Sequence, residues 1–151
     1  MESFSKWAFT GGTDGHFLGT GSAKESLNKT IFFRSTEADD CEDVVELYLQ
    51  KIKGYCLIPS SCKQTTIGYE FIPKHSLTSQ TSIAQVKQGK VGLDDRLRGI
   101  ADHVFLFSTD GVVHADSDDV TVLSADDLFD FVCKHRNLLP ARISYWLHFL
   151  S

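Results

Sequence analysis

The feature that most constrains the fold is a change of hydrophobic period at Gly54. Before this glycine, apolar residues recur at helical spacing over residues 40–53 and predict a helix with one apolar face. Asp39 or Asp40 can cap its N-terminus, and Gly54 suits its C-terminus because glycine readily adopts the left-handed conformation found there. The apolar residues of this helix are Cys41, Val44, Val45, Tyr48 and Ile52.

After Gly54, three apolar segments of strand-like composition follow closely. Strands are expected over residues 55–58, 65–72 and 82–87, ended by Pro59, Pro73 and Gly89. In the third segment Ile83, Gln85 and Lys87 share one side, because side chains alternate along a strand. The polar segment 74–80 predicts a hairpin connection, which would place the second and third strands side by side.

The rest of the chain alternates between strands and helices. The expected elements are a short helix over 93–101, strands over 103–107 and 120–123, a helix over 125–135 capped by Ser124, and a last helix over 140–150. Before residue 40, residues 29–34 fit a short strand, and residues 1–30 otherwise read as loops because they are rich in glycine, serine and threonine. This order predicts an α/β fold in which a mixed central sheet carries helices on both faces.

Charge is distributed unevenly along the chain. The net charge is −5, but residues 50–98 hold eight Lys/Arg against three Asp/Glu, whereas both flanking thirds are acidic. A local basic surface can bind phosphate groups even on an acidic protein, although the same residues could form a solvated face without a ligand. No apolar stretch is long enough to cross a bilayer and no secretory pattern opens the chain, so we expect no membrane partner and a cytoplasmic location.

Phosphodiester hydrolysis requires a residue set that the second and third strands could supply. A divalent cation needs oxygen ligands, and a lysine can stabilise the charge that develops on the phosphate. Glu70 lies in the second expected strand, and Gln85 and Lys87 lie in the third. The glutamine oxygen would bind a cation more weakly than a carboxylate does, and the Val86 carbonyl could assist it. None of the four cysteines forms a Cys-x-x-Cys pair, which argues against a zinc ribbon.

These motifs resemble those of the PD-(D/E)xK superfamily of restriction-endonuclease-like proteins, and are most similar to its Mrr-type restriction endonucleases, whose last motif is often Gln-x-Lys. The resemblance covers about residues 40–135. The helix that ends at Gly54-Tyr55 is similar to the first helix of that family, which carries a glutamate. The other similar segments are residues 68–72, 83–87, 104–111 and 120–128.

The resemblance implies a restriction-endonuclease-like domain over residues 40–151, with residues 1–39 as an N-terminal extension. It also implies a DNA endonuclease that uses Mg²⁺ or Mn²⁺ in restriction or phage defence, as a homodimer or within a larger defence complex. In that interpretation Lys87 stabilises the transition state, and the metal is held by Glu70, Gln85 and Val86 with help from Glu42. Contacts to nucleic-acid phosphates are expected from Lys63, Lys74, His75 and Lys90.

The sequence departs from the family pattern at two positions. Glu70 stands where the family usually has aspartate, and Gln85 replaces a carboxylate, as Mrr-type members tolerate. Glu46, one turn after Glu42, is an alternative helix carboxylate. The alternative function is a non-catalytic module that binds nucleic acid or protein on the same fold, and the sequence does not separate DNA from RNA. A third possibility is that aromatic side chains near the C-terminus pack against a partner: Tyr145, Trp146 and Phe149.

Overall fold

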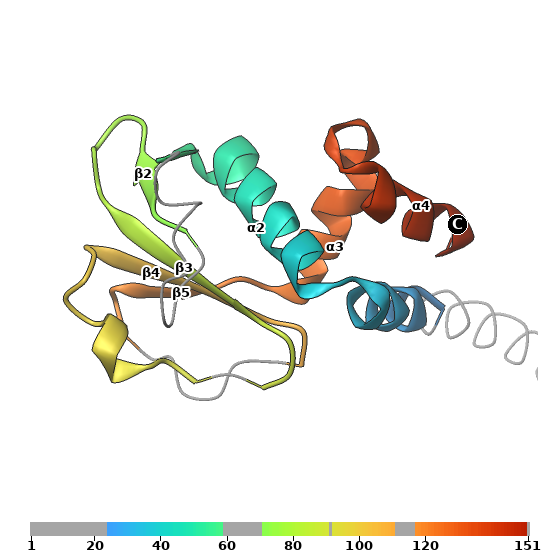
Figure 1. Cartoon of the computed structure of the whole chain (residues 1–151), viewed down its shortest axis with the longest axis horizontal. Coiled ribbons are helices and arrows are strands. Elements are labelled where there is room, and N and C mark those ends of the chain that lie inside the picture. The colour runs from blue at the N-terminus through green and yellow to red at the C-terminus, as the bar shows by residue number, and fades with distance from the viewer. Residues whose placement is uncertain (1–23, 59–70, 91, 111–116, 151) are drawn as a thin grey trace, which may run out of the picture.

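The computed structural model describes residues 24–58, 71–90, 92–110 and 117–150, and it confirms the helix that precedes Gly54 (Figure 1). Helix α2 spans Ala38–Lys53 and buries the expected apolar face except at its end, where Ile52 is exposed and Leu49 is buried instead. Gly54 follows it at φ 73°, and its N–H donates to the carbonyl oxygen of Leu49. A side chain with a Cβ is strained at this φ, which explains why a glycine ends the helix.

The start of α2 differs from the sequence prediction. Its N-cap is Glu37, whose side chain makes no capping hydrogen bond, and Asp39 and Asp40 lie inside the first turn. Asp40 is buried and pairs with Arg142 of helix α4 (Ala141–Leu150), with 2.9 Å between Oδ1 and Nη2. The predicted capping by Asp39 or Asp40 is therefore wrong, and Asp40 instead joins two helices that are distant in sequence.

The described strands form two ladders that isolated bridges join into one mixed arrangement. Strand β1 (Tyr55–Leu57) pairs antiparallel with β2 (Pro73–His75), and β3 (Ser82–Lys87), β4 (His103–Ser108) and β5 (Val120–Val122) pair parallel in that order. Antiparallel bridges from Phe71 to Ala84 and from Lys74 to Thr81 connect the two ladders. The strands expected over residues 55–58, 82–87, 103–107 and 120–123 are thus confirmed.

The hairpin before β3 is shorter than the sequence suggested. Residues 65–70 of the second expected strand lie outside the described residues, but the two bridges confirm that the chain around Phe71 runs beside β3. Pro73 begins β2 rather than ending a strand, and Lys74 and His75 belong to β2 rather than to the connection. Proline is tolerated at the first residue of a strand, because its missing N–H removes no necessary ladder hydrogen bond there.

Strand β3 separates two hydrophobic clusters. Ala84 and Val86 belong to the larger cluster, which contains the buried faces of α2, α3 (Ala125–Lys134) and α4. Ile83 belongs to a smaller cluster with Leu97, Val104 and Leu106 on the opposite face. The alternation of side chains along a strand explains this division and fixes the orientation of every residue in β3.

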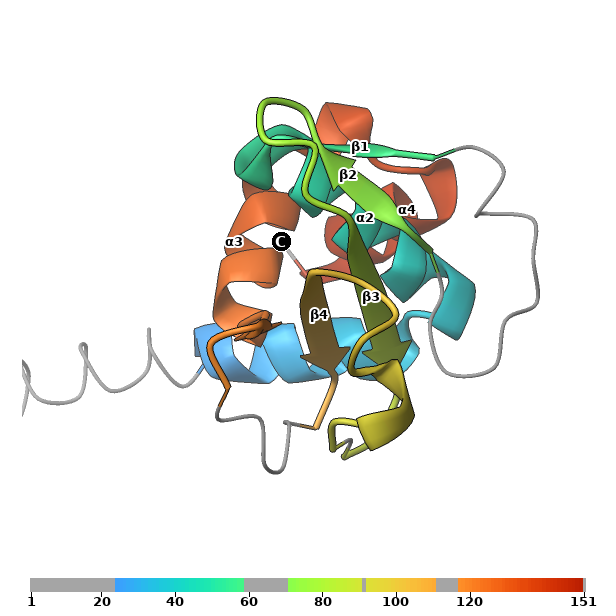
Figure 2. The same ribbon diagram turned by 90° about the vertical axis from the view of Figure 1, so that its left-hand side faces the viewer.

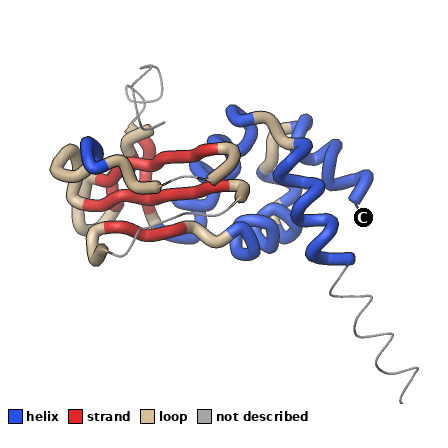
Figure 3. The backbone as a smooth tube through the Cα atoms, turned by 90° about the horizontal axis from the view of Figure 1, so that it is seen from below, coloured by secondary structure: helices blue, strands red, loops and turns tan. Residues whose placement is uncertain are grey.

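Helices do not cover both faces of the described sheet, contrary to the sequence prediction. The described α-helices gather on one side of the strands (Figure 3), and the opposite face is covered by the segment around η2 (Asp95–Leu97), a single 3-10 turn. The prediction of a helix over residues 93–101 is therefore wrong, except for this one turn. Gly99 lies at φ 84°, outside helical conformation, which prevents the turn from continuing.

The chain before residue 40 also differs from expectation. Residues 24–35 are helical, so the strand expected over residues 29–34 is wrong, and so is the reading of residues 24–30 as loop. Phe32 and Phe33 are buried in the larger cluster, where their rings lie 5.7 Å and 5.3 Å from those of Phe129 and Phe107. Two consecutive residues of a strand point to opposite faces, so both phenylalanines could not enter one core from a strand. On a helix, one ring reaches α3 and the other reaches the sheet.

The C-terminal half follows the sequence closely. Helix α3 begins after Ser124, whose side chain accepts hydrogen bonds from the N–H groups of Asp126 and Asp127, so the predicted cap is confirmed. A 3-10 turn, η3 (Arg136–Leu138), then leads to α4. Among the described helices, none has both the length and the apolar character needed to span a membrane.

We expect Arg142→Ala to lower the free energy of unfolding by about 1–3 kcal/mol, because it leaves the buried Asp40 carboxylate without its cationic partner. Lys134→Ala is the matched control, since Lys134 pairs with Asp130 on the solvent-exposed surface of α3 and should change stability by less than about 0.5 kcal/mol. Urea denaturation of both variants measures the difference. Equal losses would show that the Asp40–Arg142 pair has no special role.

Candidate functional site

The candidate site lies at the C-terminal end of β3. Gln85 and Lys87 share the side of the strand that carries Ile83, as the sequence predicted, and this is the face opposite the α-helices. Figure 2 shows the arrowheads of β3 and β4 ending at the same edge of the sheet, beside the helix of residues 24–35. In parallel sheets, ligands bind most often beyond the carboxyl ends of the strands.

Gln85 is one of two described residues of β3 that have a buried side-chain oxygen without a hydrogen-bond partner; the other is Ser82, at the opposite end of the strand. Gln85 is only 5% exposed, and its Oε1 is buried and accepts no hydrogen bond within the described structure. A buried carbonyl oxygen without a partner costs about 1–3 kcal/mol, so such groups are rare in stable folds. A side-chain amide oxygen is also a suitable ligand for Mg²⁺ or Mn²⁺. The donor chemistry of Gln85 therefore fits a hard divalent cation.

The backbone around Gln85 points the Val86 carbonyl away from β4. The Lys87 carbonyl accepts from the N–H of Thr109, which follows β4, whereas the Ala84 N–H donates to the carbonyl of Phe71 on the other side. Backbone groups of successive strand residues point to alternate sides, so the Val86 carbonyl points to the side of Phe71. Glu70, which precedes Phe71 in the sequence, lies outside the described residues.

Lys87 is half-buried at the last position of β3 and lies opposite Ser108 of β4. The Ser108 hydroxyl hydrogen-bonds to the carbonyl of Gly89, and the Gly89 N–H donates to the hydroxyl of Thr109 at 3.0 Å. These bonds hold the chain that leaves β3 against the end of β4. The backbone of Lys87 therefore lies at an edge of the sheet that these hydrogen bonds hold in place.

The two candidate helix glutamates lie in different surroundings. Glu46 accepts a hydrogen bond from Gln50 and lines a hollow with Leu138 and Pro140, on the η3 side of α2, and burial raises the pKa of its carboxyl. Glu42 is half-buried near the N-terminus of α2. That end of α2 lies beside the end of β3, because the Gln88 side chain donates to the Thr36 carbonyl at 2.8 Å.

Neither glutamate is shown on the Gln85 face of the sheet. Helix α2 packs in the cluster of Ala84 and Val86, so Glu42 lies at the correct end of β3 but against the opposite face. Glu46 faces η3 and is not brought to β3. Of the two alternatives left open by the sequence, Glu42 lies nearer to the end of β3, but the structure brings neither carboxylate to the Gln85 face.

The predicted phosphate contacts divide between the two ends of β3. Lys74 pairs with Thr81, just before β3 begins, so Lys74 and His75 lie roughly 20 Å or more along the strand from Lys87. The His75 ring faces Tyr55, and its Nδ1 accepts from the N–H groups of Leu77 and Thr78. The structure therefore does not bring Lys74 and His75 to the site.

Lys90 is exposed three residues after Lys87 and remains close to the site along the chain. Lys63 lies outside the described residues. The sequence interpretation missed the end of the helix of residues 24–35, because those residues were assigned to a strand and a loop. One indication in the sequence was the helical spacing of Leu27 and Ile31 before the apolar pair Phe32-Phe33.

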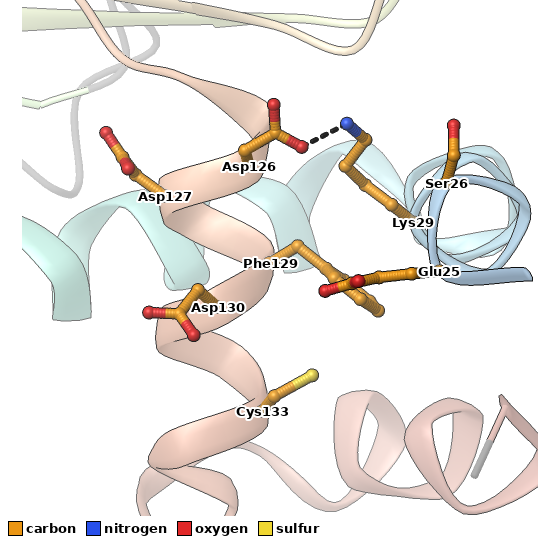
Figure 4. Close-up of a pocket in the computed structure, with 8 residues that line it drawn as sticks. All are labelled: Glu25, Ser26, Lys29, Asp126, Asp127, Phe129, Asp130 and Cys133. Carbon is orange, nitrogen blue, oxygen red and sulfur yellow. Dashed lines mark hydrogen bonds and ion pairs between the residues drawn. The ribbon is translucent and has the colours of Figure 1, made fainter. Parts of the chain in front are cut away.

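A cavity elsewhere offers no comparable chemistry. It has a volume of about 480 Å³ and lies between the helix of residues 24–35 and α3 (Figure 4). Lys29 pairs there with Asp126, and burial raises the pKa of the Cys133 thiol, which keeps that thiol protonated. In the described ranges, no three His, Cys, Asp or Glu residues are grouped so that they could hold a metal ion.

Comparison with known proteins returns no relative. No protein-family model matches the chain, and neither a curated protein nor a solved structure matches it. Its function must therefore be inferred from its own residues and their geometry.

We expect the thiols of Cys41 and Cys56 to differ strongly in reactivity at about pH 8. Cys41 is 1% exposed and its pKa is raised to about 12, chiefly by burial, whereas Cys56 is exposed. Native protein treated with a thiol reagent should be modified at Cys56, and at Cys41 only after denaturation, as peptide mass mapping would show. Equal labelling of the two in the native state would contradict the burial of Cys41.

Proposed function

We propose that the chain is a Mg²⁺- or Mn²⁺-dependent endonuclease that hydrolyses DNA phosphodiester bonds, on a restriction-endonuclease-like form of the mixed α/β fold. The observation that carries the proposal is the buried Gln85 Oε1, which lacks a hydrogen-bond donor in the described structure and lies two residues before Lys87 on the same side of β3. The order α2, β1, the chain around Phe71, β3 and parallel β4 agrees with the order of elements that the sequence resemblance implies.

Glu70 enters the proposal through the sequence resemblance, and it lies outside the described residues. Phe71, the next residue, bridges to Ala84, so the described chain that follows Glu70 runs beside β3. The proposed ligands are then the Glu70 carboxylate, the Gln85 amide oxygen and the Val86 carbonyl.

The chemistry proposed for these residues is hydrolysis of one phosphate ester bond. A divalent cation held by these residues would supply Lewis-acid chemistry, by polarising a phosphoryl oxygen and lowering the pKa of a water molecule. The water oxygen would bond to phosphorus as the ester P–O bond breaks, and the leaving oxygen would take up a proton from solvent. Gln85 and Val86 would orient the cation from a rigid, buried strand. Lys87, roughly 7 Å further along the strand, would place its ammonium beside the phosphate and stabilise the negative charge of the transition state. Restriction or phage defence is the setting proposed for this activity.

We expect Lys87→Ala to lower the rate of Mg²⁺-dependent DNA cleavage by about 10²–10³-fold, the usual effect of removing one transition-state donor. Lys51→Ala is the control, because Lys51 is exposed in the last turn of α2, at the opposite end of the sheet. Nicking of supercoiled plasmid in Mg²⁺, Mn²⁺ and EDTA measures the rates, and circular dichroism checks the fold. Wild-type cleavage by a folded Lys87→Ala variant would refute the assignment.

We expect Gln85→Leu to raise the free energy of unfolding by about 1 kcal/mol without metal, because it removes a buried oxygen that has no partner. The same variant should lose the increase in melting temperature that Mg²⁺ gives the wild type, since ligands stabilise the state that binds them. Gln80→Leu is the matched control. Its Oε1 accepts from the Tyr55 hydroxyl at 3.0 Å, so this variant should lose stability and keep the response to Mg²⁺.

The second function is a nucleic-acid- or protein-binding module without catalysis. The observation that favours it is that Gln85 supplies a neutral ligand where a nuclease usually has a carboxylate. DNA binding in EDTA without cleavage in any divalent cation would support this function. Cleavage that depends on Lys87 would exclude it.

A further inference from the structure

A second cavity lies beside the candidate site, at the same edge of the sheet. It has a volume of about 220 Å³, which is room for several water molecules of about 30 Å³ each. It is formed by the helix of residues 24–35, the chain after β4 and the residue that begins α3. The lining residues are Lys29, Thr30, Phe33, Arg34, Thr109, Asp110 and Ala125.

Three contacts place this cavity next to Lys87. Thr109, in its wall, donates its N–H to the Lys87 carbonyl at 3.2 Å. The Phe33 ring lies 5.3 Å from that of Phe107, which precedes Ser108 at the end of β4. The Gln88 side chain binds the Thr36 carbonyl, two residues after Arg34. Lys87 points to the other face of the sheet, but as the last residue of β3 it reaches the same edge (Figure 2).

The charges around this cavity favour an anion at one position. Lys29 forms an ion pair with Asp126. Arg34 is exposed, and within the described residues it forms no ion pair. Asp110 also lines the cavity, but it is exposed, so that water and salt weaken its repulsion of an anion. A guanidinium without a carboxylate partner is well suited to bind a phosphate through two hydrogen bonds.

We propose that Arg34 and this cavity form a binding subsite for a phosphate of the nucleic-acid strand, next to the phosphate that is cleaved. The inference rests on the proposed function, because that function supplies the strand. A strand that crosses the carboxyl ends of β3 and β4 would contact Lys87 with one phosphate and Arg34 with a neighbouring one. The helix of residues 24–35 then belongs to the DNA-binding surface and is not merely an extension.

The experiment measures binding of a short fluorescein-labelled DNA duplex by fluorescence anisotropy, in EDTA and over a range of salt concentrations. We expect Arg34→Gln to weaken binding by about 5–10-fold at 0.1 M salt and to reduce the slope of log K against log salt by about 0.9, the loss of one phosphate contact. Arg34→Lys should keep the slope because it keeps the charge. Asp110→Asn should bind more tightly than the wild type, since it removes the carboxylate from the cavity.

The matched control is Arg98→Gln, which makes the same change of charge at the opposite end of β4. Arg98 pairs with Asp95 and bridges to Ala101, just before β4 begins. The inference is overturned if Arg34→Gln and Arg98→Gln bind equally well, or if the wild type does not bind DNA. Melting temperatures of all variants confirm that each is folded.

Cleavage assays in Mg²⁺ separate this inference from the proposed function. If the wild type cleaves DNA and Arg34→Gln binds DNA as tightly as the wild type, the phosphate subsite is refuted and the proposed nuclease function stands. If binding depends on Arg34 but the wild type does not cleave DNA, the nuclease function is refuted. The phosphate subsite then belongs to a DNA-binding module without catalysis.

Discussion

The structure depends on the burial of β3 on both faces. Ala84 and Val86 pack against the helices, while Ile83 packs against the segment that contains Leu97. Hydrogen bonds to β4 on one side, and the bond from the Ala84 N–H to the Phe71 carbonyl on the other, hold this strand in place. A strand with partners on all sides cannot shift its register without moving apolar side chains to the wrong face, so its polar residues are held at fixed positions.

This rigidity gives Gln85 its significance. A strand enclosed by apolar clusters would be more stable with leucine or valine at this position, because the amide oxygen gives up its hydration for no hydrogen bond in the described structure. A cation that binds this oxygen would compensate for that cost. The same rigidity orients Lys87 and the Val86 carbonyl, so that a metal site at the end of β3 would need little rearrangement when it is occupied.

The helix of residues 24–35 shows how distant segments complete this edge of the sheet. Phe32 and Phe33 anchor it in the larger cluster, and its end meets the chain that leaves β3 through the bond between Gln88 and Thr36. The aromatic packing fixes the helix, and the helix in turn brings Arg34 to the cavity beside Thr109. Residues 24–39 therefore pack against the rest of the described structure.

Local patterns in the sequence determined the elements whose signals lie within a few residues: the periodic face of α2, its end at Gly54, the Ser124 cap of α3, and the alternation that puts Gln85 and Lys87 on one side of β3. These depend on backbone conformation and on neighbouring residues. Only the tertiary structure decided that residues 24–35 form a helix, that Asp40 binds Arg142, that Glu46 faces away from β3 and that the Gln85 Oε1 accepts no hydrogen bond in the described structure. Each of these depends on contacts between residues far apart in the chain, where packing outweighs the small differences in local propensity.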